Sequence, residues 1–144
     1  MREYSGILDE QLIQAYMNAE YRVLKPQITI KIGQINSHLN ELLMDNNAYY
    51  YAFITAENPF SNSFDDAENA VLMHQLAEDL TALNLVFLKG IGIDPNGNWP
   101  GENSFLVLDL HPLTASELGK KYQQNAIVVG ALGEVAMLEV LVDG

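Results

Sequence analysis

The chain contains two pairs of predicted strands in which the two strands of each pair are joined by a loop without a helix. This limits the sheet that the chain can form. Residues 85–91 and 105–110 are apolar runs separated by the turn-rich stretch 94–101, and residues 126–130 and 135–142 are separated by Ala131-Leu132-Gly133. Parallel neighbours need a long crossover, usually a helix, so the second pair must form an antiparallel hairpin. A purely parallel sheet is therefore excluded.

Helical patterns account for much of the remaining chain. They cover residues 8–21, a short segment from Asn36 or Ser37, residues 63–84, and a segment opened by the capping box Thr114-x-x-Glu117. In the first of them, Leu12, Ala15, Tyr16 and Ala19 recur at helical spacing and are expected to face the core.

Strand patterns cover residues 27–33 and 49–54, and the second is apolar or aromatic almost throughout, which indicates a strand covered on both faces. We predict an α+β fold: a single domain over residues 1–144, with a mostly antiparallel or mixed sheet of about six strands and about four helices packed on it.

Charge and composition exclude several kinds of function. The chain has 19 acidic and 7 basic residues, a net charge of −12, and the bases are scattered, so nucleic-acid binding is not expected. No apolar run approaches the ~20 residues of a membrane helix, and the first residues lack the apolar core of a signal peptide. With no cysteine present, the chain fits a reducing compartment, and we expect a cytoplasmic protein without membrane contact.

The stretch 54–61, Ile-Thr-Ala-Glu-Asn-Pro-Phe-Ser, carries the first candidate site group. It joins the predicted strand 49–54 to a polar loop, and strand ends that open into loops commonly carry functional side chains. Thr55, Glu57 and Asn58 are the candidates, and Pro59 keeps Asn58 out of helical geometry. The alternative is that Thr55 and Asn58 only bond the loop backbone to itself.

Glu68 and Asn69 form the second group, at the start of the long predicted helix. Both lie at helical spacing from leucines that should face the core, so they must be paired or face a cavity if they are buried. The alternative is a solvated position at the helix rim. We also consider Glu68 and Glu102 as weak catalytic candidates.

Two further groups lie near other element ends. Trp99, Glu102, Asn103 and Ser104 precede a strand, and a tryptophan beside an acid can wall a pocket and raise the acid's pKa; the alternative is a tryptophan that caps the core. Gln123, Gln124 and Asn125 follow a helix, where amides either fix a ligand or satisfy the last carbonyls of the helix.

Other chemistries lack support in the sequence. His38, His74 and His111 are too far apart for a local metal motif, and Ser61, Ser63 and Ser104 have no nucleophile-elbow context. Carboxylates such as Glu57, Glu68 and Glu102 supply the oxygen ligands that magnesium prefers, yet no spacing demands a metal. We predict no cofactor and no metal site.

Four motifs follow one another along the chain: Thr55-Ala56-Glu57-Asn58-Pro59-Phe60, then Glu68-Asn69, then Asp94-Pro95 with Trp99 and Glu102, then Tyr122-x-Gln124-Asn125-Ala126. Together they resemble a bacterial family, the domain-of-unknown-function family 3293. The resemblance covers roughly residues 16–129. In that family the position of Glu57 is usually tryptophan, so the resemblance favours Asn58 over Glu57. It implies that the polar groups belong together and implies no activity, substrate or cofactor.

Three functional hypotheses remain open. The first is a site for a small polar ligand, held by Thr55, Asn58, Asn69, Gln124 and Asn125, covered by Trp99, with Glu102 as charge or base. The second is an interaction module or homodimer that pairs through the terminal strand 135–142 at a sheet edge, with the polar motifs purely structural. The third is a metal-dependent hydrolase that uses Glu68 and Glu102.

Overall fold

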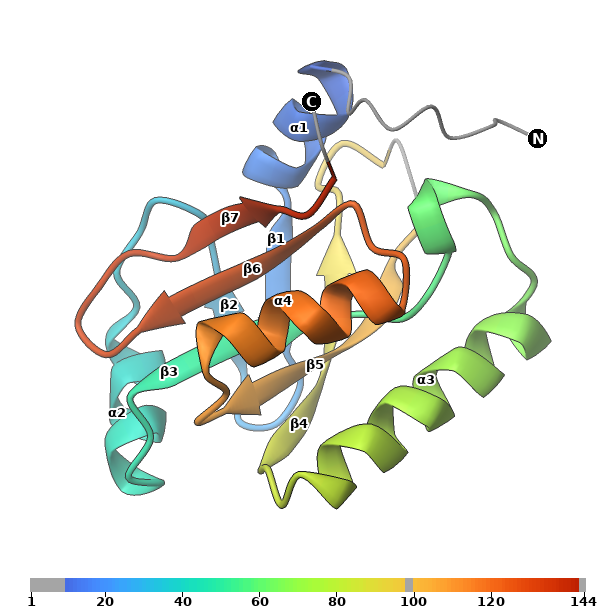
Figure 1. The fold of residues 1–144 in the computed structure, drawn as a ribbon. Helices are drawn as coiled ribbons and strands as arrows, with labels where there is room; N and C mark the ends of the chain where they lie inside the picture. The colour runs from blue at the N-terminus through green and yellow to red at the C-terminus, as the bar shows by residue number, and fades with distance from the viewer. Residues whose placement is uncertain (1–9, 98–99, 143–144) are drawn as a thin grey trace.

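The computed structural model describes residues 10–97 and 100–142, and within them the chain forms four α-helices, one 3₁₀ helix and seven strands (Figure 1). The helices are α1 (Glu10–Asn18), α2 (Ser37–Asp45), α3 (Asp66–Ala82) and α4 (Pro112–Lys121), with the 3₁₀ helix at Pro59–Ser61. The strands are β1 (Glu20–Val23), β2 (Ile28–Ile30), β3 (Tyr50–Ile54), β4 (Phe87–Ile93), β5 (Glu102–Leu108), β6 (Ala126–Ala131) and β7 (Met137–Val140).

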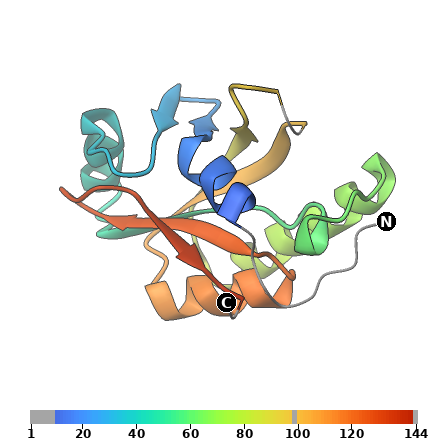
Figure 2. The same cartoon turned by 90° about the horizontal axis from the view of Figure 1, so that it is seen from above.

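The strands form one antiparallel sheet that curls until its two edges meet. Their order is β2-β1-β4-β5-β3-β6-β7, and every neighbouring pair is antiparallel. Just beyond β2, the Gly33 amide donates to the Ala136 carbonyl at 2.8 Å, and the Ala136 amide donates to the Gln34 carbonyl at 3.2 Å. Figure 2 shows the resulting curl from above, with α1 lying across its open end. The predicted α+β class is therefore confirmed, with one strand more than expected.

The inside of the curl holds one hydrophobic core. Alternate side chains of the strands point inward, so Tyr51 and Phe53 of β3 meet Leu106 of β5 and Val128 of β6 there. Leu39 and Leu43 of α2 are buried against the same core.

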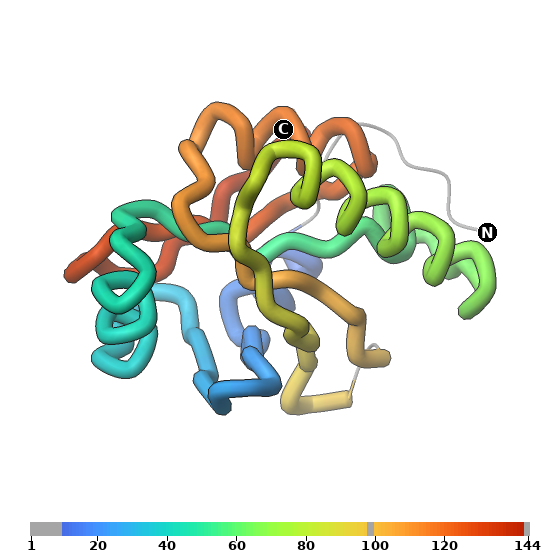
Figure 3. Tube along the Cα trace, turned by 90° about the horizontal axis from the view of Figure 1, so that it is seen from below, coloured from blue at the N-terminus to red at the C-terminus, as the bar shows by residue number. Residues whose placement is uncertain are grey.

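The outer face of the sheet carries a second core beneath α3 and α4, which lie side by side on it (Figure 3). Ala52 and Ile54 of β3 point to this side and pack with Leu76 of α3 and Leu118 of α4. Four consecutive residues of β3, from Tyr51 to Ile54, are buried, which confirms that this strand is covered on both faces.

The first predicted helix, over residues 8–21, is wrong in its second half. The helix ends at Asn18, no residue of α1 is fully buried, and Glu20–Val23 is a strand paired with both β2 and β4. Tyr21 and Val23 alternate inward along that strand. Two backbone ladders therefore outweigh the helical spacing of the side chains. Residues 8 and 9 lie outside the described residues.

Two other boundaries also differ from the sequence pattern. The predicted capping box at Thr114 is wrong, because α4 begins at Pro112 and the imidazole of His111 accepts the Leu113 amide at 3.2 Å. Proline is favoured at the first helical position, and this moves the start upstream. Strand β5 begins at Glu102 rather than residue 105, which places the Glu102 side chain on the sheet.

Among the residues that the structure describes, none of the helices has the length and apolar character needed to cross a membrane.

Candidate functional site

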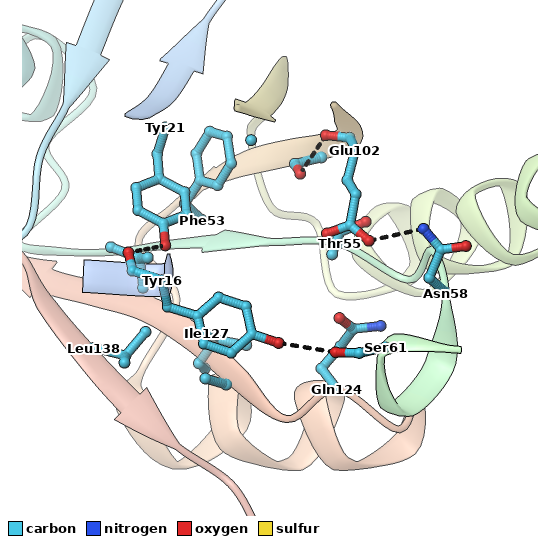
Figure 4. Close-up of a pocket in the computed structure, with 14 residues that line it drawn as sticks. Tyr16, Tyr21, Phe53, Thr55, Asn58, Ser61, Glu102, Gln124, Ile127 and Leu138 are labelled. Carbon is cyan, nitrogen blue, oxygen red and sulfur yellow. Dashed lines mark hydrogen bonds between the residues drawn. The ribbon is translucent and has the colours of Figure 1, made fainter. Parts of the chain in front are cut away.

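A small pocket lies inside the curl at the end crossed by α1 (Figure 4). Its volume is about 50 Å³. Its walls come from α1, the loop after β3 and the inner faces of the strands. The described lining residues are Tyr16, Tyr21, Phe53, Thr55, Asn58, Ser61, Gly92, Glu102, Ser104, Gln124, Ala126, Ile127, Val128 and Leu138. The mouth of a barrel-like sheet is a common position for a small ligand.

The loop after β3 enters the pocket wall in an unusual backbone conformation. Asn58, Phe60 and Ser61 have φ values of 50°, 53° and 62°, in the left-handed region that non-glycine residues seldom adopt. Such residues cost on the order of 1–3 kcal/mol each unless their surroundings hold them. The Phe60 amide donates to the Gln123 carbonyl at 2.6 Å, which ties this loop to the connection between α4 and β6. The side chains of Asn58 and Ser61 both line the pocket as a result.

Asn58 is the centre of a hydrogen-bond network that links the loop to α3 and β5. Its backbone amide donates to Oδ1 of Asn69 at 2.9 Å, and Nδ2 of Asn69 donates back to its Oδ1 at 3.0 Å. The Phe64 amide donates to the same Oδ1 at 3.0 Å. Nδ2 of Asn58 then donates to Oε2 of Glu102 at 2.8 Å. Asn69 therefore braces the loop, and Asn58 connects this brace to a carboxylate in the pocket.

Glu102 enters the pocket from the first residue of β5 (Figure 4). Burial raises the pKa of its carboxyl to about 7, the Asn58 hydrogen bond acts in the opposite direction, and the negative charge of Glu57 adds to the rise. A carboxyl with a pKa near neutrality can hold or release a proton at physiological pH, which is the property of a general acid or base.

Tyr16 and Ser61 form the opposite wall, and Asn125 lies behind Ser61. The hydroxyl groups of Tyr16 and Ser61 share a hydrogen bond of 3.1 Å, and Nδ2 of Asn125 donates to Oγ of Ser61 at 2.8 Å. Asn125 is 3% exposed, and its Oδ1 is buried without a hydrogen-bond partner. A buried unpaired acceptor is costly, and this oxygen lies behind the pocket wall, out of reach of a molecule in the pocket.

Gln124 closes the side between the loop and α4. Its Nε2 donates to the backbone carbonyls of Glu57 at 3.0 Å and Tyr122 at 3.2 Å. Both N–H bonds of the amide are thus spent on the backbone, and the amide oxygen is left at the pocket wall beside Ser61 (Figure 4).

The structure brings most of the predicted site residues together. Thr55, Asn58, Glu102 and Gln124 line the pocket, while Asn69 and Asn125 lie directly behind Asn58 and Ser61. Glu68 is exposed and completes a capping box with Asp65 at the start of α3, so it does not meet Glu102. Trp99 lies outside the described residues.

Glu57 faces the other side of β5. It is 7% exposed, and its carboxylate accepts hydrogen bonds from the Asn103 amide at 3.0 Å and from Nδ2 of Asn103 at 3.2 Å. It lines a separate groove of about 430 Å³ that also contains Met73 of α3 and Lys89 of β4. Its effect on the pocket is therefore electrostatic, through the pKa of Glu102.

Tyr16, Tyr21, Phe53 and Ser61 are among the pocket residues that the candidate site groups leave out. Helical spacing assigns Tyr16 to a core-facing helix that ends at Tyr21, and only the curl of the sheet brings both tyrosines into the pocket with Glu102. The hydroxyl of Tyr21 donates to the Tyr16 carbonyl at 2.6 Å, which joins β1 to α1 at the pocket. Burial is the largest cause of the raised pKa of Tyr21, and the nearby Tyr16 and Glu102 add to it.

Within the described residues, no group of three or more His, Cys, Asp or Glu side chains lies where it could hold a metal ion.

One family model matches the chain. Its description is "Protein of unknown function (DUF3293)", and the match covers residues 54–127, about half of the chain, from the end of β3 to the start of β6. No curated protein and no solved structure matches.

Proposed function

Because the chain belongs to the DUF3293 family, whose description names no activity, we propose a function from the pocket itself: the protein binds a small polar molecule at the loops around residues 54–61. The observation that carries this proposal is the convergence of a strained loop, a buried carboxyl with a raised pKa and the free amide oxygen of Gln124 on one cavity. Strain of this kind is kept where it positions functional side chains.

The size of the pocket limits the ligand. A volume of about 50 Å³ is far below the ~300–1,000 Å³ of pockets for drug-sized molecules. Since a water molecule needs roughly 10–15 Å³ of such volume, the pocket accepts a group of only a few non-hydrogen atoms. The ligand is therefore a very small molecule, or one polar end of a larger molecule.

Filling the pocket should abolish ligand binding. Ala126 and Val128 are two residues apart on β6 and share its inner face, so a leucine at position 126 enters the cavity. We expect Ala126→Leu to lose binding of every compound that binds the wild type in a screen of small polar metabolites by ligand-observed NMR. Overpacking of this kind costs about 1–3 kcal/mol of stability, which the fold should tolerate.

Ala67→Leu, an exposed change in the first turn of α3, is the matched control and should retain binding. Circular dichroism would show whether both variants are folded. Compounds that bind Ala126→Leu as well as the wild type would contradict the pocket as the binding site.

A second candidate function is homodimer formation through β7. This strand lies at the edge of the sheet, and Met137 and Val140 are 59% and 43% exposed. The closing contact with residues 33–34 uses Ala136 and leaves the following residues of β7 open along their outer edge. Edge strands of this kind pair with a second copy of the chain.

A lysine at Met137 should prevent such pairing, because lysine is a typical guard of edge strands. If β7 mediates a dimer, Met137→Lys should elute from a size-exclusion column as a monomer while wild type elutes as a dimer. Val71→Lys, on the exposed face of α3, is the control and should not change the elution volume. Equal elution of wild type and Met137→Lys would speak against this edge.

A further inference from the structure

Five of the described lining residues carry a hydroxyl group: Tyr16, Tyr21, Thr55, Ser61 and Ser104. Three of them donate to backbone carbonyl groups, which uses the single hydrogen that each possesses. These bonds are Tyr21 to Tyr16 at 2.6 Å, Thr55 to Asn103 at 2.6 Å, and Ser104 to Glu102 at 3.0 Å. These three hydroxyls therefore have no hydrogen left to donate to a bound molecule.

The amide groups differ in how many of their hydrogens the protein uses. Nε2 of Gln124 spends both of its hydrogens on backbone carbonyls, whereas Nδ2 of Asn58 spends one of two on Glu102. In the part of the chain that the structure describes, no donor meets Oε1 of Gln124 or the second oxygen of Glu102. The pocket wall therefore offers two acceptors to a bound molecule, the amide oxygen of Gln124 and one carboxylate oxygen of Glu102.

The charge of the wall has one sign. Glu102 is the only acidic residue among the described lining residues, and no lysine, arginine or histidine is among them. The rings of Tyr21 and Phe53 line the same pocket, with centroids 5.4 Å apart in an edge-to-face arrangement. Aromatic faces attract cations, and a carboxylate in a poorly solvated cavity does so more strongly.

We infer that the ligand of this pocket is a small cation with several N–H donors, such as an alkylammonium or a guanidinium group. The inference rests on the proposed function and names the chemical class of its ligand. One N–H of such a group donates to the free oxygen of Glu102, and another reaches the amide oxygen of Gln124. A guanidinium has four non-hydrogen atoms, in keeping with a cavity of about 50 Å³.

The test compares probes that differ in charge and in donors. Guanidinium and urea share a planar shape, but only guanidinium is charged; methylammonium carries N–H donors, tetramethylammonium has the charge without them, and acetate is an anion. The three cations are added as chlorides, acetate as its sodium salt and urea as the neutral compound, each at millimolar concentration to the full chain. The melting temperature and the heat of binding are recorded for each probe. Specific ligands raise the melting temperature by mass action.

The matched variants are Glu102→Gln and Glu41→Gln, which remove the same charge from the pocket and from the exposed face of α2. We expect guanidinium or methylammonium to stabilise the wild type and Glu41→Gln. Glu102→Gln should bind them at least tenfold more weakly, because a hydrogen bond to a charged group is lost. Urea, tetramethylammonium and acetate should have no such effect.

Two results would overturn the inference in different ways. If urea or acetate binds and loses binding in Ala126→Leu while the cations do not bind, the ligand class is wrong and the proposed function survives. If no probe binds, or if Glu102→Gln binds the cations as tightly as the wild type, the cation site is wrong. The proposed function itself fails by a different result: compounds that still bind to Ala126→Leu as well as they bind to the wild type.

Discussion

Replacing Asn69 with alanine should lower the free energy of unfolding by about 2–4 kcal/mol, because each buried polar group left without a partner costs about 1–3 kcal/mol. Asn69 is 6% exposed and accepts the Asn58 amide while it donates to Oδ1 of Asn58. It also donates to the Phe64 carbonyl at 3.4 Å. The loss of these bonds leaves the left-handed loop at Asn58 without its main support. Urea denaturation would measure the change.

Asn46→Ala is the control for this variant. Asn46 is exposed at the end of α2, and its side chain makes one hydrogen bond, to the Leu42 carbonyl at 2.8 Å. A substitution of this kind should change stability by less than about 0.5 kcal/mol. If Asn69→Ala were as mild as Asn46→Ala, the amide pair would not hold the loop, and the pocket wall would have another support.

Replacing Glu102 with glutamine should change how stability depends on pH. The pKa of Glu102 is raised from 4.5 to about 7, so the folded protein holds this proton more tightly than the unfolded chain does. This contribution to stability is fully present below about pH 4.5 and is lost as the pH rises through about 7. The glutamine variant, which cannot ionise, should gain on the order of 2 kcal/mol over wild type across this window.

The groups that face Glu102 are the same in both proteins, so their titration cancels in the difference. They are Asn58 and the charge of Glu57 from the loop, Tyr16 from α1 and Tyr21 from β1. Chemical denaturation of Glu102→Gln, Glu41→Gln and wild type at about pH 5 and about pH 8 provides the measurement. A difference between Glu102→Gln and wild type that does not grow with pH would mean that the carboxyl is well solvated.

Local patterns were sufficient to predict the parts of the fold that depend on neighbouring residues. The short connection at residues 131–133 forces an antiparallel hairpin, and the apolar run of β3 requires cover on both faces; both features are present. The sequence also placed Thr55, Asn58 and Gln124 at the ends of helices and strands. All three line the same pocket, because the cavity opens at the strand ends near α1.

The remaining features depend on contacts between distant residues. Strand β1 exists because two ladders pair with it, and the curl exists because residues 33–34 meet Ala136, a separation that no local pattern encodes. Glu68 and Asn69 illustrate the same limit on one helix. They are adjacent in the sequence, but successive residues of a helix point in directions about 100° apart. Glu68 therefore caps the helix at the surface, whereas Asn69 is buried against Asn58.

The most direct test of the central claim is chemical-shift mapping on the ¹⁵N-labelled protein during titration with mixtures of small polar metabolites. If the pocket is a ligand site, at least one compound will shift a compact set of signals that includes the backbone amides of Ser61, Glu102 and Gln124 and the side-chain amide of Asn58. These shifts will be absent in Ala126→Leu. Shifts that gather on β7 or in the groove beside Glu57, with the pocket signals unmoved, would contradict the account.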